Sequence, residues 1–132
     1  MRIITSLILF GLLVAVSPAL AEDVFDGTKP LLCASIEALD CDPGVTCERG
    51  IPEIMGAPQF LRIDFAKNEI AGPQRITKIR SMEKDDDQIV MQGYEIGLGW
   101  TFAIDRLTGN ARISFAGWNS SFIVFAVCTS YL

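Results

Sequence analysis

The sequence predicts an all-β domain, a small antiparallel β-barrel or sandwich of about six to seven strands in meander order, stapled by disulfides. Two features support this prediction. From residue 60 onwards, apolar and polar residues alternate in short runs, and turn residues separate these runs. Four cysteines, an even number, lie in a chain whose first residues have the pattern of an export signal.

Residues 1–21 have the features of a secretory signal peptide. Arg2 is followed by an apolar run, and Ala19-Leu20-Ala21 forms the A-x-A pattern that precedes cleavage. The apolar run is shorter than the ~20 residues of a transmembrane helix. We therefore expect cleavage between Ala21 and Glu22, and a periplasmic or secreted protein that has no membrane anchor after cleavage.

The remaining chain has the length of one domain. Residues 22–30 are polar and contain Gly27 and Pro30, so we expect a loose N-terminal segment, followed by a single β domain over residues 31–132. Loss of Arg2 with the leader would leave 10 basic and 16 acidic residues and change the formal net charge from −5 to −6. This acidity disfavours nucleic acid or an anionic membrane surface as a partner. The expected partner is an unknown protein or small ligand, bound by a monomer, and no membrane partner is expected after cleavage of the leader.

The four cysteines, Cys33, Cys41, Cys47 and Cys128, are expected to form two disulfides. Cys33 and Cys41 would lie about 26 Å apart in a strand or about 12 Å apart in a helix. A disulfide allows only about 7 Å between the Cα atoms, so this spacing disfavours a Cys33–Cys41 bridge. Of the two remaining pairings we prefer Cys41–Cys47 with Cys33–Cys128, because residues 42–46 are rich in turn formers.

Segments of alternating polarity predict the strands. Residues 31–40 are interpreted as a strand, although Leu32, Ile36 and Leu39 also fit helical spacing. Residues 41–58 contain several Gly and Pro residues and predict a loop. The other predicted strands cover residues 60–65, 75–82, 88–94, 99–105, 111–116 and 122–127. The last of these is apolar on both faces, which predicts a strand that is covered on both sides.

Two polar segments predict hairpin turns. In residues 105–110, the Asp105 side chain can bond back to loop amides as an Asx turn, and Gly109 can adopt a positive φ. Residues 83–87 form the second turn and include the acidic run Asp85-Asp86-Asp87. The spaced ligand pattern of a calcium loop is absent from this run. The preferred interpretation is therefore a solvated hairpin tip.

Five segments of the mature chain together resemble a family of small exported, periplasmic proteins of proteobacteria whose function is unknown. These segments are Phe25–Cys33, Pro58–Phe65, Met91–Gly93, Gly99–Gly109 and Val127–Thr129. The resemblance covers nearly the whole mature chain. It implies a bacterial, periplasmic setting, and it implies no catalytic, cofactor or ligand residues.

The sequence contains no histidine, which removes Ser–His and Cys–His catalytic arrangements and the common zinc sites. Asp64, Glu95 and Asp105 could supply the facing acids of a small Asp/Glu-dependent hydrolase. Exposed carboxylates on strands are more often simply solvated. We therefore expect no enzyme activity, no cofactor and no metal.

The expected function is a non-enzymatic binding or inhibitor module. Trp118 and Asn119, in the link between the last two strands, and Tyr94 form the candidate binding surface, because an exposed Trp can anchor a partner. Packing over one end of the core is the competing interpretation for these residues. The alternative functions are the hydrolase and a lipocalin-like carrier of a small ligand. A carrier requires an interior that aromatic side chains do not fill, and the candidates for filling it are Phe65, Phe102, Phe115 and Phe125.

Overall fold

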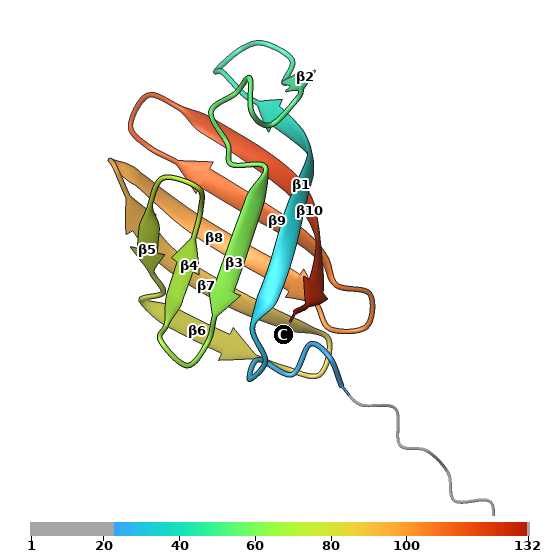
Figure 1. Cartoon of the computed structure of the whole chain (residues 1–132). Helices are drawn as coiled ribbons and strands as arrows, with labels where there is room; N and C mark the ends of the chain where they lie inside the picture. The colour runs from blue at the N-terminus through green and yellow to red at the C-terminus, as the bar shows by residue number, and fades with distance from the viewer. Residues whose placement is uncertain (1–22, 132) are drawn as a thin grey trace, which may run out of the picture.

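The computed structural model describes residues 23–131, and the expected leader, with its cleavage site between Ala21 and Glu22, lies outside the described residues. The described part folds into ten antiparallel strands that form one curled sheet (Figure 1). The strands are β1 (Leu31–Asp40), β2 (Glu48–Gly50), β3 (Phe60–Asp64), β4 (Glu69–Ala71), β5 (Ile76–Lys78), β6 (Ser81–Lys84), β7 (Gln88–Glu95), β8 (Leu98–Asp105), β9 (Asn110–Ala116) and β10 (Ser121–Ser130). The predicted all-β, antiparallel, barrel-like fold is confirmed, with more strands than expected.

The sheet follows the order β5-β4-β3-β1-β10-β9-β8-β7-β6, with β2 paired to β1 outside this path. Its two ends, β5 and β6, are separated in the chain by only Ile79 and Arg80. The Arg80 amide donates a hydrogen bond to the Gln92 carbonyl of β7 (2.8 Å). One bent stretch therefore joins both ends of the sheet. If β5 and β6 are counted as one strand and β2 is left out, eight strands surround the interior.

The prediction of a single strand over residues 75–82 is wrong, because this stretch forms two strands that pair with different partners. β5 pairs with β4, whereas β6 pairs with β7. The change of partner occurs at Ile79, whose side chain turns into the core. A strand that bends between two neighbours brings the two ends of the sheet together, which curls the sheet into a barrel-like shape.

Alternation places one face of each long strand inside. On β8 the inward side chains are Trp100, Phe102 and Ile104. On β10 the buried residues are Val124, Ala126 and Cys128. The outer face of β10 carries Phe125, half-buried, and Val127, which is 42% exposed. The expectation that β10 is covered on both sides is therefore wrong, because the barrel wall is a single layer whose outer face meets solvent.

The first described strand, β1, is extended throughout, so the helical alternative for residues 31–40 is wrong. Its register with β10 shifts between Ser35 and Glu37. This bulge places Ile36 on the outside, where its side chain is exposed. The helical spacing of the apolar residues in this segment thus reflects one extra residue in a strand.

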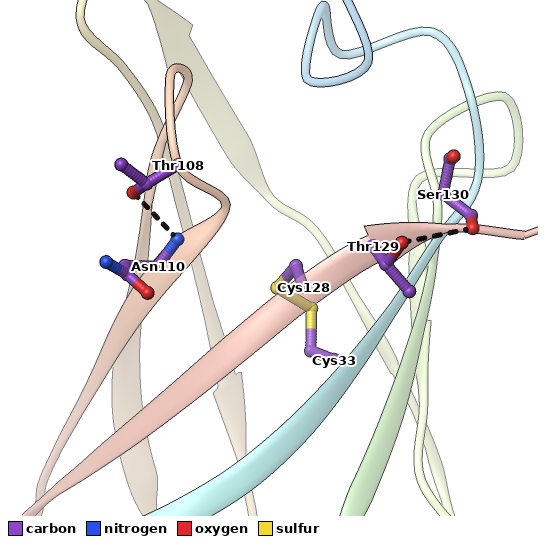
Figure 2. Close-up of a disulfide and its surroundings, with 6 residues drawn as sticks. All are labelled: Cys33, Thr108, Asn110, Cys128, Thr129 and Ser130. Atoms are coloured by element: carbon purple, nitrogen blue, oxygen red, sulfur yellow. Dashed lines mark hydrogen bonds between the residues drawn. A yellow bond between two sulfur atoms is a disulfide. The ribbon is translucent and has the colours of Figure 1, made fainter.

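The structure contains the disulfides Cys33–Cys128 and Cys41–Cys47, the two pairs that the sequence favoured. Cys33 and Cys128 are direct partners across β1 and β10, with 3.9 Å between their Cα atoms. Figure 2 shows this bridge beside the β8–β9 turn, where the Asn110 amide donates to the Thr108 hydroxyl (3.2 Å). Two disulfides indicate an oxidising, extracytoplasmic environment.

The N-terminal segment, residues 23–30, is not loose as expected but closes one end of the barrel. Phe25 packs against the core, and a Cβ on Gly109 would lie 2.4 Å from the Phe25 ring. Arg106 holds the segment in place, since its Nε donates to the Phe25 carbonyl (3.1 Å) and its guanidinium forms an ion pair with Asp23. The Lys84 ammonium also donates to the Asp26 carbonyl (2.9 Å). We call this the closed end (bottom of Figure 1).

The β8–β9 turn has the predicted Asx geometry. The Asp105 carboxylate accepts hydrogen bonds from the amides of Leu107 (2.9 Å) and Thr108 (2.8 Å), and Gly109 has a φ of 74°. The Thr108 amide, followed by the Thr108 hydroxyl, holds the pKa of Asp105 below its ordinary value of 3.8. This turn is built by its own local hydrogen bonds.

The two disulfides are expected to contribute unequally to stability. Cys33–Cys128 spans 95 residues and Cys41–Cys47 spans 6. The chain-entropy model assigns about 4–5 kcal/mol to the first loop and about 2 kcal/mol to the second. We expect Cys33→Ala/Cys128→Ala to lower the free energy of unfolding, measured in urea, by about twice as much as Cys41→Ala/Cys47→Ala. Equal losses for the two double variants would contradict this ranking.

Acid should destabilise the protein through its turn carboxylates. The folded-state pKa of Asp105 is lowered, so its stabilising effect is present above the unfolded pKa and is lost as the pH falls through the folded pKa. The same sign holds for Asp26 and Asp85. We expect the free energy of unfolding to decrease below about pH 4. Asp105→Asn keeps the acceptor oxygen but not the charge, and its stability should fall less with acid. An identical acid response in both proteins would refute the assignment to Asp105.

Candidate functional site

A cavity of about 590 Å³ lies at the end of the barrel opposite to Phe25. We call this the open end. The segment 53–59, the β4–β5 turn, the β7–β8 turn and the adjoining ends of β9 and β10 surround its mouth. The lining side chains within the barrel are Leu61, Ile70, Thr77, Leu98, Trp100, Phe102, Ile113, Phe115 and Phe122. All of these except Thr77 are apolar, so the cavity is a hydrophobic site that opens to solvent.

Aromatic side chains form much of the cavity wall. The rings of Phe115 and Phe122, on neighbouring strands, stack with their centroids 4.4 Å apart and an interplanar angle of 15°. Trp100 lies deeper and is 5% exposed, and its indole Nε1 donates to the Thr77 hydroxyl (3.3 Å). Its one polar atom is thereby satisfied. The wall thus presents flat apolar surfaces to a ligand.

Gly93 fixes the position of the Trp100 ring. These two residues are direct partners across β7 and β8. A Cβ on Gly93 would lie 2.2 Å from the Trp100 indole and 2.7 Å from the Lys78 carbonyl. The missing side chain therefore lets the indole lie flat against β7 while β5 approaches from the other side. No larger residue fits here without displacing the ring.

The four phenylalanines that could have filled the interior do not all point into it. Phe125 lies on the outer face of β10, opposite the exposed Arg112 of β9. Phe65 is buried at the end of β3 that leads into the β3–β4 turn. Phe102 and Phe115 line the cavity instead of filling it. The interior therefore keeps space for a ligand, which is the condition that a carrier requires.

Polar and charged side chains gather at the mouth. Glu53, Gln59, Gln74, Arg75 and Glu95 border the opening, and the first four come from loops. A ligand with an apolar body would therefore bury that body inside and leave any polar group at the rim. Such a distribution, apolar walls with a few polar groups that orient the ligand, is typical of small-molecule sites.

The three candidate acids of a hydrolase do not meet. Glu95 lies at the open end, whereas Asp105 lies at the opposite end of the β7–β8 hairpin. Asp64 accepts a hydrogen bond from the Lys67 amide (3.0 Å) and stabilises the β3–β4 turn. A pair of facing acids, which glycoside hydrolysis requires, is therefore not formed by these residues. The hydrolase alternative has no support from this arrangement.

The acidic run at the β6–β7 turn is a hairpin tip. Asp85 accepts hydrogen bonds from the amides of Asp87 (2.9 Å) and Gln88 (2.8 Å). The Gln88 amide, ahead of the Asp87 amide, lowers the pKa of Asp85. Within residues 23–131 no group of three or more His, Cys, Asp or Glu side chains could hold a metal ion. The turn is explained by its own hydrogen bonds.

The predicted binding surface is only partly brought together. Trp118 is 94% exposed in the β9–β10 loop and therefore does not cap the core. Asn119 lies beside it, and both border a hollow of about 170 Å³ against Cys41 and Pro43. Tyr94 lies two strands away on β7, where the Arg80 guanidinium sits 5.5 Å from its ring centroid. Sequence reasoning did not locate the cavity. The one signal that could have pointed to it is Gly93, the cross-strand partner of the inward Trp100 in the cavity wall.

The fold and the site thus define a small disulfide-bonded β-barrel with an apolar cavity at one end. No family model, curated protein or solved structure matches the chain. Of the residues that the structure describes, none belongs to a helix long and apolar enough to cross a membrane. The functional inference therefore rests on the cavity itself.

The two tryptophans should report separately on the cavity and on the open-end loops. Trp118 is solvent-exposed and Trp100 is buried against the cavity. We expect Trp118→Phe to shift the fluorescence emission to shorter wavelength and to remove most of the quenching by acrylamide. Trp100→Phe should do the opposite and leave a fully quenchable, red-shifted emission. Similar quenching of the two single-Trp variants would show that the cavity wall is open to solvent.

Proposed function

We propose that this protein is a non-enzymatic binding module that holds a small, mainly apolar molecule in its barrel. The observation that carries the proposal is the apolar cavity of about 590 Å³ at one end of the curled sheet. Ligand pockets in proteins usually measure about 300–1,000 Å³. Eight-stranded barrels are wide enough to enclose one small ligand. The volume of the cavity, its apolar wall and the number of strands are thus all typical of a barrel that holds one small ligand.

The walls favour a ligand with a flat or branched apolar body. The stacked Phe115 and Phe122 rings and the Trp100 indole offer aromatic contacts. The charged side chains at the mouth, Glu53, Arg75 and Glu95, would face a polar group of the ligand. The proposed ligand class is therefore an apolar molecule with at most one polar end.

We place this activity in the periplasm or outside the cell. The two disulfides require an oxidising environment to form and persist. The pattern of residues 1–21, which is typical of a cleaved leader, supports the same setting. An apolar metabolite has low solubility in such an aqueous compartment, and a carrier would keep it dispersed.

Titration with N-phenyl-1-naphthylamine, a neutral dye that fluoresces in apolar surroundings, tests the proposal. We expect saturable enhancement of dye emission at one site per chain. Leu98→Trp adds bulk at the mouth and should keep part of the dye from the apolar wall. We expect this loss of apolar contact to cost more than about 1.4 kcal/mol and so to weaken dye binding at least about tenfold. Leu107→Trp, on the closed-end turn where the side chain is 90% exposed, is the matched control.

The control variant should bind the dye like the wild type. Thermal unfolding of both variants shows whether each is folded. Absence of dye binding by the wild type, or unchanged binding by a folded Leu98→Trp protein, would refute the proposed site.

A further inference from the structure

Exposed apolar side chains lie in the loops at the open end of the barrel. Val45, Ile54, Ile96 and Trp118, which we call the apolar rim, are between 64% and 94% exposed. They come from four separate segments: the loop closed by Cys41–Cys47, the turn at residues 51–56, the β7–β8 turn and the β9–β10 loop. Four such residues at one end of a small barrel exceed the scatter of single exposed apolar side chains.

The segments of the apolar rim adjoin one another at the open end. Ile96 itself lines the cavity, and Ile54 lies between two lining residues, Glu53 and Gly56. The β9–β10 loop touches the β7–β8 turn, since a Cβ on Gly117 would lie 3.1 Å from the Gly97 carbonyl. The Ser121 hydroxyl donates to the Cys41 carbonyl (3.0 Å), which joins the disulfide loop to β10. The four loops that carry the apolar rim therefore lie at the same end of the barrel as the opening (upper part of Figure 1).

Ile96 occupies a position that the fold alone does not favour. It has a φ of 47°, and Gly97 after it has a φ of 79°. Two-residue hairpin turns with positive φ at both central residues prefer Asn-Gly or Asp-Gly. A β-branched residue in this region is strained, and here the side chain is mostly exposed, so little burial compensates the strain. A costly apolar residue at the mouth of the cavity points to a function of the side chain.

The two ends of the barrel differ in chemistry. Among the described residues, the turns of the closed end expose one large apolar side chain, Leu107. That end also carries the acidic run of residues 85–87. The mouth has charges of both signs, Glu53, Glu95 and Arg75. With a formal net charge of −5 for the chain, an anionic surface would repel the protein as a whole, so a surface without net charge fits the apolar rim better.

We propose that the apolar rim docks on the surface of a zwitterionic phospholipid bilayer, with the cavity mouth facing the lipid. Separate loop tips that each carry one apolar side chain can insert between headgroups, and Trp in particular favours the membrane interface. The cavity opens inside the rim, so an apolar ligand passes between bilayer and barrel without crossing water. This proposal rests on the proposed function, because the docked orientation matters only if the cavity is loaded or emptied there.

Flotation with phosphatidylcholine vesicles tests the docking. The protein is the disulfide-bonded chain from an exporting host, and its mass verifies that residues 1–21 are absent. We expect the wild type to float with the vesicles, with little dependence on salt. The triple variant Ile54→Ser/Ile96→Asn/Trp118→Ser should partition at least about tenfold less, because three apolar side chains no longer enter the lipid. Leu107→Ser, at the closed end, is the matched control and should float like the wild type.

Ile96→Asn by itself separates docking from folding. Asn tolerates the left-handed conformation better than Ile, so this variant should unfold at a higher temperature than the wild type. It should nevertheless bind the vesicles less. A structural role for Ile96 would instead lower the unfolding temperature, and unchanged vesicle binding would contradict a role in docking.

The remaining outcomes also decide between the proposals. Wild-type protein that binds N-phenyl-1-naphthylamine but does not float with phosphatidylcholine overturns the docking and leaves the proposed function standing. Absence of both activities overturns both. Binding only to vesicles that contain anionic lipid overturns the docking, because it shows an electrostatic mode. A dimer in solution that the triple variant dissociates would show that the apolar rim joins two copies of the chain, and this outcome also overturns the docking.

Discussion

The pairing of β1 with β10 is the interaction on which the rest of the structure depends. These two strands come from opposite ends of the domain, and they share the longest ladder of paired residues in the sheet. The Cys33–Cys128 bridge joins direct partners in that ladder. Without the pairing of β1 with β10, the meander from β3 to β10 would be an open sheet with two unpaired edges. Closure converts one face of that sheet into an enclosed interior.

The two ends of the barrel differ, because one is packed by the N-terminal segment and the other contains the cavity. At the closed end, Phe25 packs beneath the turn at Gly109, and Arg106 ties its backbone to the barrel. At the open end, no part of residues 23–131 covers the aromatic pair Phe115 and Phe122 in the same way, and the cavity remains. The N-terminal segment thus fills one end of the interior and leaves the cavity at the other.

Sequence reasoning predicted the long strands and their turns, but it did not predict the short strands β2, inside the expected loop 41–58, and β4, nor the cavity. Alternation identified β3, β8 and β9, because each has one buried and one solvated face. The Asx turn at Asp105 was predictable because its hydrogen bonds join neighbours in the chain. The split of β5 from β6, and the order imposed on residues 23–30, were not predictable. Both depend on partners far away in sequence. The polarity pattern of one segment carries no information about which distant segment it contacts.

The sequence by itself determined the class of fold, the preferred cysteine pairs and the absence of histidine chemistry, because composition and spacing record these directly. Only the tertiary structure decided that Phe125 faces out while Phe102 and Phe115 border an empty volume. Face assignment in an all-apolar strand depends on the register of its neighbours, which alternation cannot fix there. Likewise, the approach of the β9–β10 loop, which carries Trp118, to the β7–β8 turn, which carries Ile96, follows from the curling of the sheet.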